Sequence, residues 1–302
     1  MNRKEFDSLK INEFGCEYLP KDVRLEYFER LIKPYKKQDN QFFILQYLDG
    51  DGNELNQKFW SIHSSSRFAF ELYSWMAADN RVSGFEFEKK LIGLHGSPKA
   101  PNMDVYIQIK NRIIFIESKF SEASSQNINN LSESYYLEKG EAKNSRGGKV
   151  ESELIDRYYG DKQASEKFSN FIRSVKSKLD CNSYNRCWMD FKQEITHLFG
   201  IYFTIKKNQK EYVNKDILFL NVYYDFQDKT NDVIEWFFLE ANKLMNALLK
   251  NKCSSFTYNH ISAQNLVKSE QLIKFNANTK AFGLENKTIG ELLKKYFELS
   301  IE

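Results

Sequence analysis

The sequence contains few of the residues that build zinc sites and disulfide scaffolds. Four cysteines and four histidines occur among its 302 residues. No two cysteines form a Cys-x-x-Cys pair, and no two histidines have a spacing typical of zinc ligands. The sequence therefore argues against a zinc finger or a disulfide-stabilised domain, and it favours reduced thiols of the kind found in cytoplasmic proteins.

Long apolar runs are also missing. None approaches the roughly 20 residues of a membrane-spanning helix, because the best candidate, Ile234–Leu249, contains Glu235, Glu240 and Lys243. Residues 1–7 lack the apolar segment of a secretory signal. We therefore expect a cytoplasmic protein with no membrane partner.

The composition is that of a folded globular protein. Hydrophobic residues make up 41% of the chain and charged residues 28%, which supplies a core and excludes a disordered chain. The net charge is only +3, with a pI near 8.4. This small excess neither requires nor excludes a nucleic-acid partner, so any such partner would have to bind local basic patches.

The order of expected elements indicates an α/β protein with a central mixed sheet flanked by helices. Apolar periodicity predicts helices and strands in alternating groups. We expect helices over 64–78, 166–179, 189–199, 232–249 and 288–299, and strands over 85–91, 103–109, 112–120, 217–224 and 255–258. A polar stretch over 121–148 reads as a long surface insertion.

The N-terminal region contains an apparent calcium motif that we reject. Residues 41–47 predict a strand, and the turn cluster Asp49–Asn53 follows it. Its Asp-x-Asp-x-Asn spacing resembles an EF-hand loop. However, Glu54 stands where that loop needs glycine, and Trp60 where it needs a bidentate glutamate. A β-hairpin turn is the better interpretation.

The most informative segment is 101–120, in which two strand-like runs flank Lys110 and Asn111. We expect a two-residue hairpin turn there, because asparagine tolerates a left-handed backbone. This turn pairs Ile109 with Arg112 and thereby fixes the register of the two strands.

In this register two carboxylates face each other. Asp104 lies opposite Glu117 with Cβ atoms about 5 Å apart, and Lys119 points to the same face. Facing carboxylates repel unless a cation lies between them, and oxygen ligands suit Mg²⁺, with Mn²⁺ as a substitute. We expect Asp104, Glu117 and the carbonyl of Ser118 to bind the metal, and Lys119 to orient or deprotonate an attacking water. A plain Glu117–Lys119 salt bridge is the alternative, but it leaves Asp104 unexplained.

These residues resemble the signature of a known nuclease superfamily. Pro101-x-x-Asp104 followed by Glu117-Ser118-Lys119 is similar to the motif of the PD-(D/E)xK superfamily, although two residues separate Pro101 from Asp104. The resemblance implies a restriction-endonuclease-like fold and a metal-dependent nuclease, with Asp104 and Glu117 as metal ligands and Lys119 as the catalytic lysine.

The similarity is specific over residues 87–122, which look like bacterial restriction endonucleases of this superfamily. The expected order of a helix, three strands, a helix and a strand matches its αβββαβ core. By this resemblance the chain divides into an N-terminal extension with a β-hairpin, residues 1–63, and a nuclease domain, residues 64–302.

Many members of the superfamily add a further acidic residue near the first helix or strand. Glu71, Glu88 and Glu122 are the candidates. The alternative for Glu71 is a solvated helix glutamate, and for Glu88 a charge at the edge of the sheet. A polar residue from the second core helix also belongs to such sites, and we select Gln193. His197, on the same helical face, reads as a structural histidine.

The resemblance favours DNA as the substrate, in restriction or another defence system, and duplex symmetry favours a homodimer. The alternatives are a repair or recombination nuclease and an inactive DNA-binding subunit of the same fold. Basic residues for phosphate contact occur in the insertion and in a later predicted loop: Lys139, Lys143, Arg146, Lys149, Lys206, Lys207 and Lys210.

Overall fold

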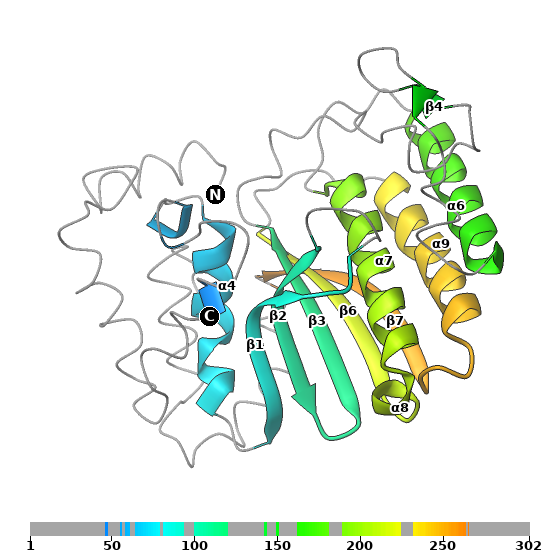
Figure 1. Cartoon of the computed structure of the whole chain (residues 1–302). Coiled ribbons are helices and arrows are strands. Elements are labelled where there is room, and N and C mark those ends of the chain that lie inside the picture. The colour runs from blue at the N-terminus through cyan, green and yellow to red at the C-terminus, as the bar shows by residue number, and fades with distance from the viewer. Residues whose placement is uncertain are drawn as a thin grey trace.

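The computed structural model describes residues 46–47, 55, 58–60, 64–78, 81–93, 100–119, 142–143, 149–150, 162–180, 189–224, 232–263 and 265. These residues form an α/β fold built on a five-stranded mixed sheet (Figure 1). The α/β class expected from the sequence is therefore confirmed.

The sheet has the strand order β1-β2-β3-β6-β7. β2 is antiparallel to both β1 and β3, whereas β3, β6 and β7 run parallel. In a separate two-stranded sheet, β4 lies inside the predicted insertion and β5 directly follows it. The strands are β1 (Val82–Lys90), β2 (Asn102–Ile109), β3 (Arg112–Lys119), β4 (Ala142–Lys143), β5 (Lys149–Val150), β6 (Asp216–Tyr223) and β7 (Ser255–Ser262).

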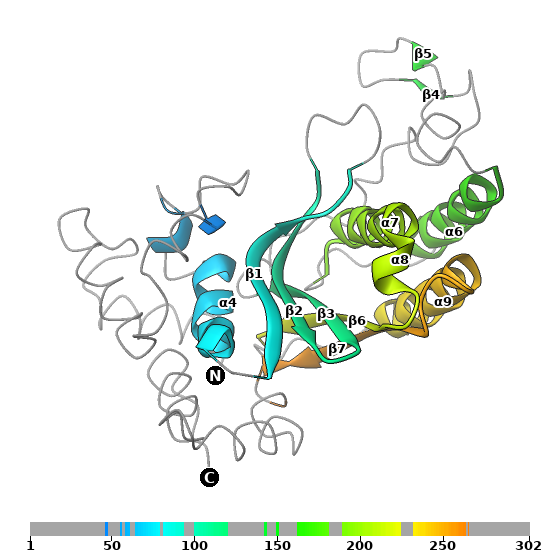
Figure 2. The ribbon, with the colours of Figure 1, turned by 60° about the horizontal axis from the view of Figure 1, so that its bottom comes forward.

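Helices cover both faces of the five-stranded sheet. Figure 2 shows α4 on one face and α6, α7 and α9 on the other. The α-helices are α4 (Ser65–Tyr73), α6 (Lys162–Asp180), α7 (Phe191–Lys207), α8 (Gln209–Tyr212) and α9 (Asp232–Leu249), and the 3₁₀ helices are η4 (Lys58–Trp60) and η5 (Ser74–Ala78).

The predicted start of the first core helix is confirmed. Ser64 is the N-cap of α4, and its hydroxyl accepts a hydrogen bond from the backbone N of Arg67 at 3.0 Å. The helix packs aromatic rings against β1, with the Phe70 and Phe87 ring centroids 5.5 Å apart.

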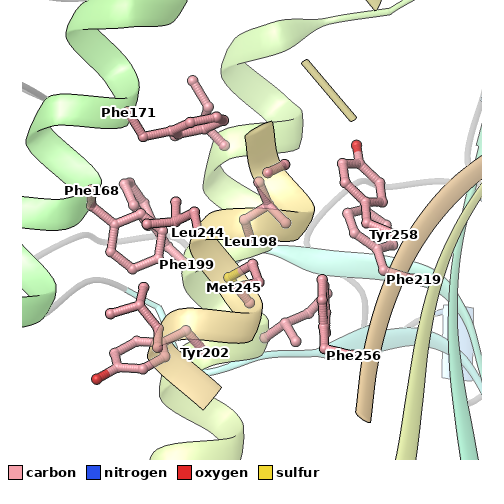
Figure 3. Packing of buried hydrophobic residues seen from close by; sticks show 14 of the residues in the cluster. Phe168, Phe171, Leu198, Phe199, Tyr202, Phe219, Leu244, Met245, Phe256 and Tyr258 are labelled. Carbon is pink, nitrogen blue, oxygen red and sulfur yellow. The ribbon is translucent and has the colours of Figure 1, made fainter. Parts of the chain in front are cut away.

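The main hydrophobic core lies between the sheet and α6, α7 and α9 (Figure 3). Phe199 of α7 meets Phe168 of α6 edge to face, at 4.3 Å between ring centroids. Phe219 of β6 stacks on Tyr258 of β7, also at 4.3 Å. Phe238 of α9 also contacts Tyr258, at 4.3 Å between ring centroids, so aromatic rings join this helix to the parallel half of the sheet.

The β2–β3 hairpin has the predicted two-residue turn. Ile109 pairs with Arg112, as expected. The left-handed residue is Lys110, with a φ of 54°, rather than Asn111. The Asn111 side chain instead donates a hydrogen bond to Asp216 Oδ2 at 3.1 Å and so ties the turn to the start of β6.

The prediction that α7 ends at Gly200 is wrong, because the helix continues to Lys207. A Cβ atom at Gly200 would lie 2.6 Å from Pro101 Cγ and 2.9 Å from Leu91 Cβ. Glycine at this position therefore allows the β1–β2 connection to approach the helix closely, and it does not end the helix.

The N-terminal strand prediction is wrong where it can be compared, because Gln46 and Tyr47 are helical. The turn over 49–53, the rest of the predicted hairpin and the helix over 288–299 lie outside the described residues. Within the described part of the chain, no helix has both the length and the apolar character needed to cross a membrane.

Candidate active site

The carboxyl-terminal end of β3 is buried and yet carries charged side chains. Glu117, Ser118 and Lys119 follow the apolar residues 113–116, and their exposed fractions are 2%, 0% and 2%. β2 and β6 flank β3, so these residues lie inside the sheet and not at its edge. A charge at such a position is costly unless it has a partner.

A closed group of hydrogen bonds links Lys119, Glu117 and Gln193. The Lys119 ammonium donates to Glu117 Oε1 at 2.6 Å and to Gln193 Oε1. Gln193 Nε2 donates to the same Glu117 oxygen at 2.8 Å. The side chain of Asp190 caps α7 and accepts from the backbone N of Gln193, which holds Gln193 at the start of the helix. Three predicted site residues are thus in direct contact.

Asp104 reaches the same place from β2. The predicted β2–β3 register is confirmed as far as Val105 and Ile116, where the ladder ends. One position further, Asp104 Oδ2 accepts a hydrogen bond from the backbone N of Ser118 at 2.6 Å. The Asp104 carboxyl group therefore lies against the β3 backbone, next to Glu117.

The electrostatic environment of Asp104 is strongly unfavourable to its negative charge. Burial raises the pKa of Asp104 well above its ordinary value, and the charges of Glu117 and Glu88 raise it further. The Lys119 ammonium and the hydrogen bond from Ser118 lower it. These carboxyl groups are close enough to repel one another, and a cation held between them would relieve that repulsion.

One oxygen of Glu117 has no hydrogen bond. Oε1 accepts from Lys119 and Gln193, whereas Oε2 is buried and has no partner among the described residues. His197 Nδ1 lies 3.6 Å from Oε2. Burial lowers the pKa of His197, so its ring is neutral at neutral pH. His197, interpreted from the sequence as purely structural, therefore lies directly beside a predicted metal ligand.

Glu88 lies beside Asp104 in the sheet, because β1 pairs with β2 on both sides of this position. Its φ is 50°, an uncommon conformation for a residue other than glycine. Since its charge also raises the pKa of Asp104, Glu88 stays a candidate for the additional acidic residue.

The first core helix brings a tyrosine toward Asp104. The Tyr73 hydroxyl is buried and has no hydrogen-bond partner in the described part of the chain. Burial and the charge of Asp104 raise the pKa of Tyr73 above its ordinary value. Glu71 is in the same helix, but its side chain is outside the described residues, as is all of Glu122.

A second buried polar group was missed by the sequence analysis. The Tyr258 hydroxyl donates to Glu194 Oε2 at 2.5 Å, and Asn221 Nδ2 donates to the Tyr258 oxygen at 3.0 Å. Glu194 and Asn221 are each 0% exposed. Burial raises the pKa of Glu194 to about 7, while the charge of Lys119 acts in the opposite direction.

One sequence signal could have revealed Glu194. It interrupts the apolar face of α7 that continues through Leu198, Ile201 and Ile205, all of them 0% exposed. A carboxylate on such a face must be buried and needs partners. The expected helix end at Gly200 shortened this face and hid the signal.

The described residues contain no group of three or more His, Cys, Asp or Glu side chains placed to hold a metal ion. The site instead offers two carboxylates, Asp104 and Glu117, and the backbone of Ser118. Magnesium sites commonly use one or two protein carboxylates and retain several waters. The two carboxylates and the Ser118 backbone are a set of donor groups of that size.

The lysines of the predicted later loop lie far from this site. Lys206 and Lys207 are in the last turn of α7, and Lys210 is in α8, so they are helical. At the rise of an α-helix, Lys207 is about 20 Å from Gln193 along the axis of α7. These lysines therefore flank the opposite end of the helix.

No protein-family model matches this chain, and neither a curated protein nor a solved structure matches it. Its function therefore has to be inferred from the residues and their geometry.

Proposed function

We propose that the chain is a Mg²⁺-dependent DNA endonuclease with a restriction-endonuclease-like core of the PD-(D/E)xK type, acting in restriction or another defence system. The observation that carries this proposal is the Lys119–Glu117–Gln193 group beside Asp104, at the ends of adjacent strands. The order α4, β1, β2, β3, α7, β6 supports it, because that order is similar to the αβββαβ core, with α6 added before α7.

The residues present fit a divalent cation. Asp104, Glu117 and Glu194 bring carboxyl groups to the Lys119 ammonium, so negative charge is in excess when all of them are ionised. Glu117 Oε2 is an acceptor without a donor within the described residues. Asp104, Glu117 and the Ser118 carbonyl would hold the ion, and Mn²⁺ would replace Mg²⁺.

When bound, the cation supplies positive charge that offsets the charge developing on the phosphoryl oxygens. Lys119 donates hydrogen bonds and orients the attacking water. Gln193 contacts both Lys119 and Glu117 and keeps the two side chains in a fixed geometry. Asp104 binds the Ser118 amide and so fastens β2 to β3 where their ladder ends.

The exposed surface of the site indicates the direction of substrate approach. Asp104 and Gln193 keep part of their surface accessible, whereas Glu117 and Lys119 are each 2% exposed. Solvent therefore reaches the site beside Asp104 and Gln193, and we propose that substrate approaches from this side. The preference for DNA over RNA rests on the superfamily resemblance.

Incubation of supercoiled plasmid with the protein and Mg²⁺ or Mn²⁺ tests the proposal. We expect nicked and linear products, which chelation of the metal abolishes. Lys119→Ala is expected to cut at least about 100-fold more slowly, because it removes the group that orients the water. Lys243→Ala is the matched control, since Lys243 is exposed and pairs with Glu240 on α9. Full activity of Lys119→Ala would contradict the proposed role.

The same assay separates the alternatives. Defined fragments on a sequencing gel indicate a site-specific endonuclease, and ladders that start from DNA ends indicate a repair or recombination nuclease. DNA binding without cleavage, with either metal, indicates an inactive subunit and refutes the enzymatic proposal.

A further inference from the structure

Glu194, Tyr258 and Asn221 form a buried hydrogen-bonded chain next to the candidate active site. The donors point toward Glu194, because Asn221 donates to Tyr258 and Tyr258 donates to Glu194. Glu194 Oε1 and Asn221 Oδ1 accept no hydrogen bond from the described residues. A buried carboxyl group with so few donors is costly, so a purely structural role would not favour it.

Tyr258 is held rigidly. Its ring stacks on Phe219 (Figure 3), at 4.3 Å between centroids and an interplanar angle of 5°. The Phe238 ring centroid also lies 4.3 Å away. Its backbone N donates to Asn242 Oδ1 at 2.8 Å, and its carbonyl accepts from Asn242 Nδ2 at 2.7 Å. The hydroxyl that binds Glu194 is therefore fixed by β6, β7 and α9 together.

The hydrogen-bonded chain of Glu194, Tyr258 and Asn221 lies directly beside the proposed catalytic group. In the parallel ladder Asn221 is the register partner of Glu117. Glu194 is adjacent to Gln193 on α7, and Gln193 contacts both Glu117 and Lys119. Among the charges that act on Glu194, that of Lys119 is the strongest.

We propose that Glu194, held by Tyr258 and Asn221, is a positioning residue that acts through Lys119. Its negative charge attracts the Lys119 ammonium and keeps it oriented between Glu117 and Gln193. The inference rests on the proposed nuclease function, and it assigns Glu194 no contact with substrate or metal.

The charge of Glu194 depends on pH. Because burial raises its pKa to about 7, the carboxyl group becomes charged as the pH rises through neutrality. The charge of Lys119, the hydrogen bond from Tyr258 and the nearby Asn221 amide favour the charged form, and Glu117 disfavours it. The groups that face Glu194 or its partners are Glu117 and Lys119 from β3, Asn221 from β6, Tyr258 from β7, His197 from α7, and the Phe237 and Phe238 rings from α9.

The test is the rate of plasmid cleavage in Mg²⁺ between about pH 5.5 and pH 8.5, for wild type and Glu194→Gln. At low pH the wild-type carboxyl group is neutral, so the two rates are expected to be similar. At high pH the wild type is expected to be about 10-fold faster in kcat, with little change in KM. A structural defect alone would lower the rate of the variant by the same factor at every pH.

Two further variants complete the test. Tyr258→Phe keeps the carboxyl group but removes its donor, so the rise in rate is expected to move to higher pH, because that hydrogen bond lowers the pKa of Glu194. If Glu194→Gln does not fold, the pH profile of Tyr258→Phe still tests the proposal. Glu240→Gln, a change in a surface ion pair of α9, is expected to follow wild type throughout.

The outcomes are distinguishable. A wild-type to Glu194→Gln ratio that is constant with pH, or a Tyr258→Phe profile identical to wild type, overturns the positioning role and leaves the nuclease function intact. Absence of metal-dependent cleavage by the wild type overturns the nuclease proposal itself, and the positioning role with it.

Discussion

The two halves of α7 pack against the same sheet but differ in chemistry. The first half presents Gln193, Glu194 and His197, which contact or face polar and charged groups on β3 and β7. The second half presents Ile201 and Ile205, which are 0% exposed and belong to the hydrophobic core. The same helix thus contributes side chains to both the hydrophobic core and the candidate active site.

This difference shows where stability and function are separated in the molecule. Burial of apolar side chains stabilises the fold in the second half. In the first half, buried polar groups contribute little net stability, and Glu194 Oε1 and His197 Nδ1 have no hydrogen bond among the described residues. Substitutions in the two halves are therefore expected to have different consequences.

The largest expected effect comes from Asp104→Asn. Loss of the carboxylate charge weakens cation binding, so we expect cleavage to slow by about 100-fold to 1000-fold. DNA affinity, measured by fluorescence anisotropy in the absence of divalent metal, is expected to change little. Near wild-type cleavage would remove Asp104 from the site.

Phe199→Ala probes the apolar packing of α7 at the middle of the helix, where the apolar half begins. Phe199 is 1% exposed and contacts Phe168 edge to face. Its removal leaves a cavity and is expected to lower the free energy of unfolding by about 3–5 kcal/mol. Urea denaturation measures this change, and Leu239→Ala, at a position 55% exposed, is the control with little expected effect. Equal effects of the two variants would contradict the packing described here.

Glu194→Gln also tests the difference between the two halves of α7, through the pH dependence of the free energy of unfolding. The folded pKa of Glu194, about 7, is above its ordinary value of 4.5, so the folded state holds the proton more tightly. Relative to the variant, the wild type is therefore most stable below about pH 4.5, and it loses stability as the pH rises through 7. The expected loss is on the order of 3 kcal/mol. Thermal unfolding at several pH values measures it, and a difference that does not vary with pH would refute it.

Gly200→Ala is expected to have the smallest effect. Helix propensity alone would favour alanine by about 1 kcal/mol. The new Cβ would lie 2.6 Å from Pro101 Cγ and 2.9 Å from Leu91 Cβ, and such overpacking costs about 1–3 kcal/mol. We therefore expect a net decrease in the midpoint of denaturation, and an increase would show that the β1–β2 connection adjusts without strain.

Much of the fold followed from local patterns. The register of β2 and β3 was predictable because a two-residue turn fixes every pair after it. Helix α9 was predicted with its observed bounds, since its apolar stripe is uninterrupted. The end of α7 was not predictable, because the reason for Gly200 is a neighbour distant in sequence, Pro101. The helical state of Gln46 and Tyr47 was likewise not predicted, because residues 41–47 have a strand-like pattern.

The sequence by itself determined which residues could form a catalytic group, because the strand period places Asp104, Glu117 and Lys119 on one face of a hairpin. Only the tertiary structure decided which partners meet them. Gln193, His197 and the Glu194–Tyr258–Asn221 chain come from α7, β6 and β7, and these elements reach β3 through parallel pairing and helix packing. Such contacts depend on how distant segments pack together, and no local periodicity encodes them.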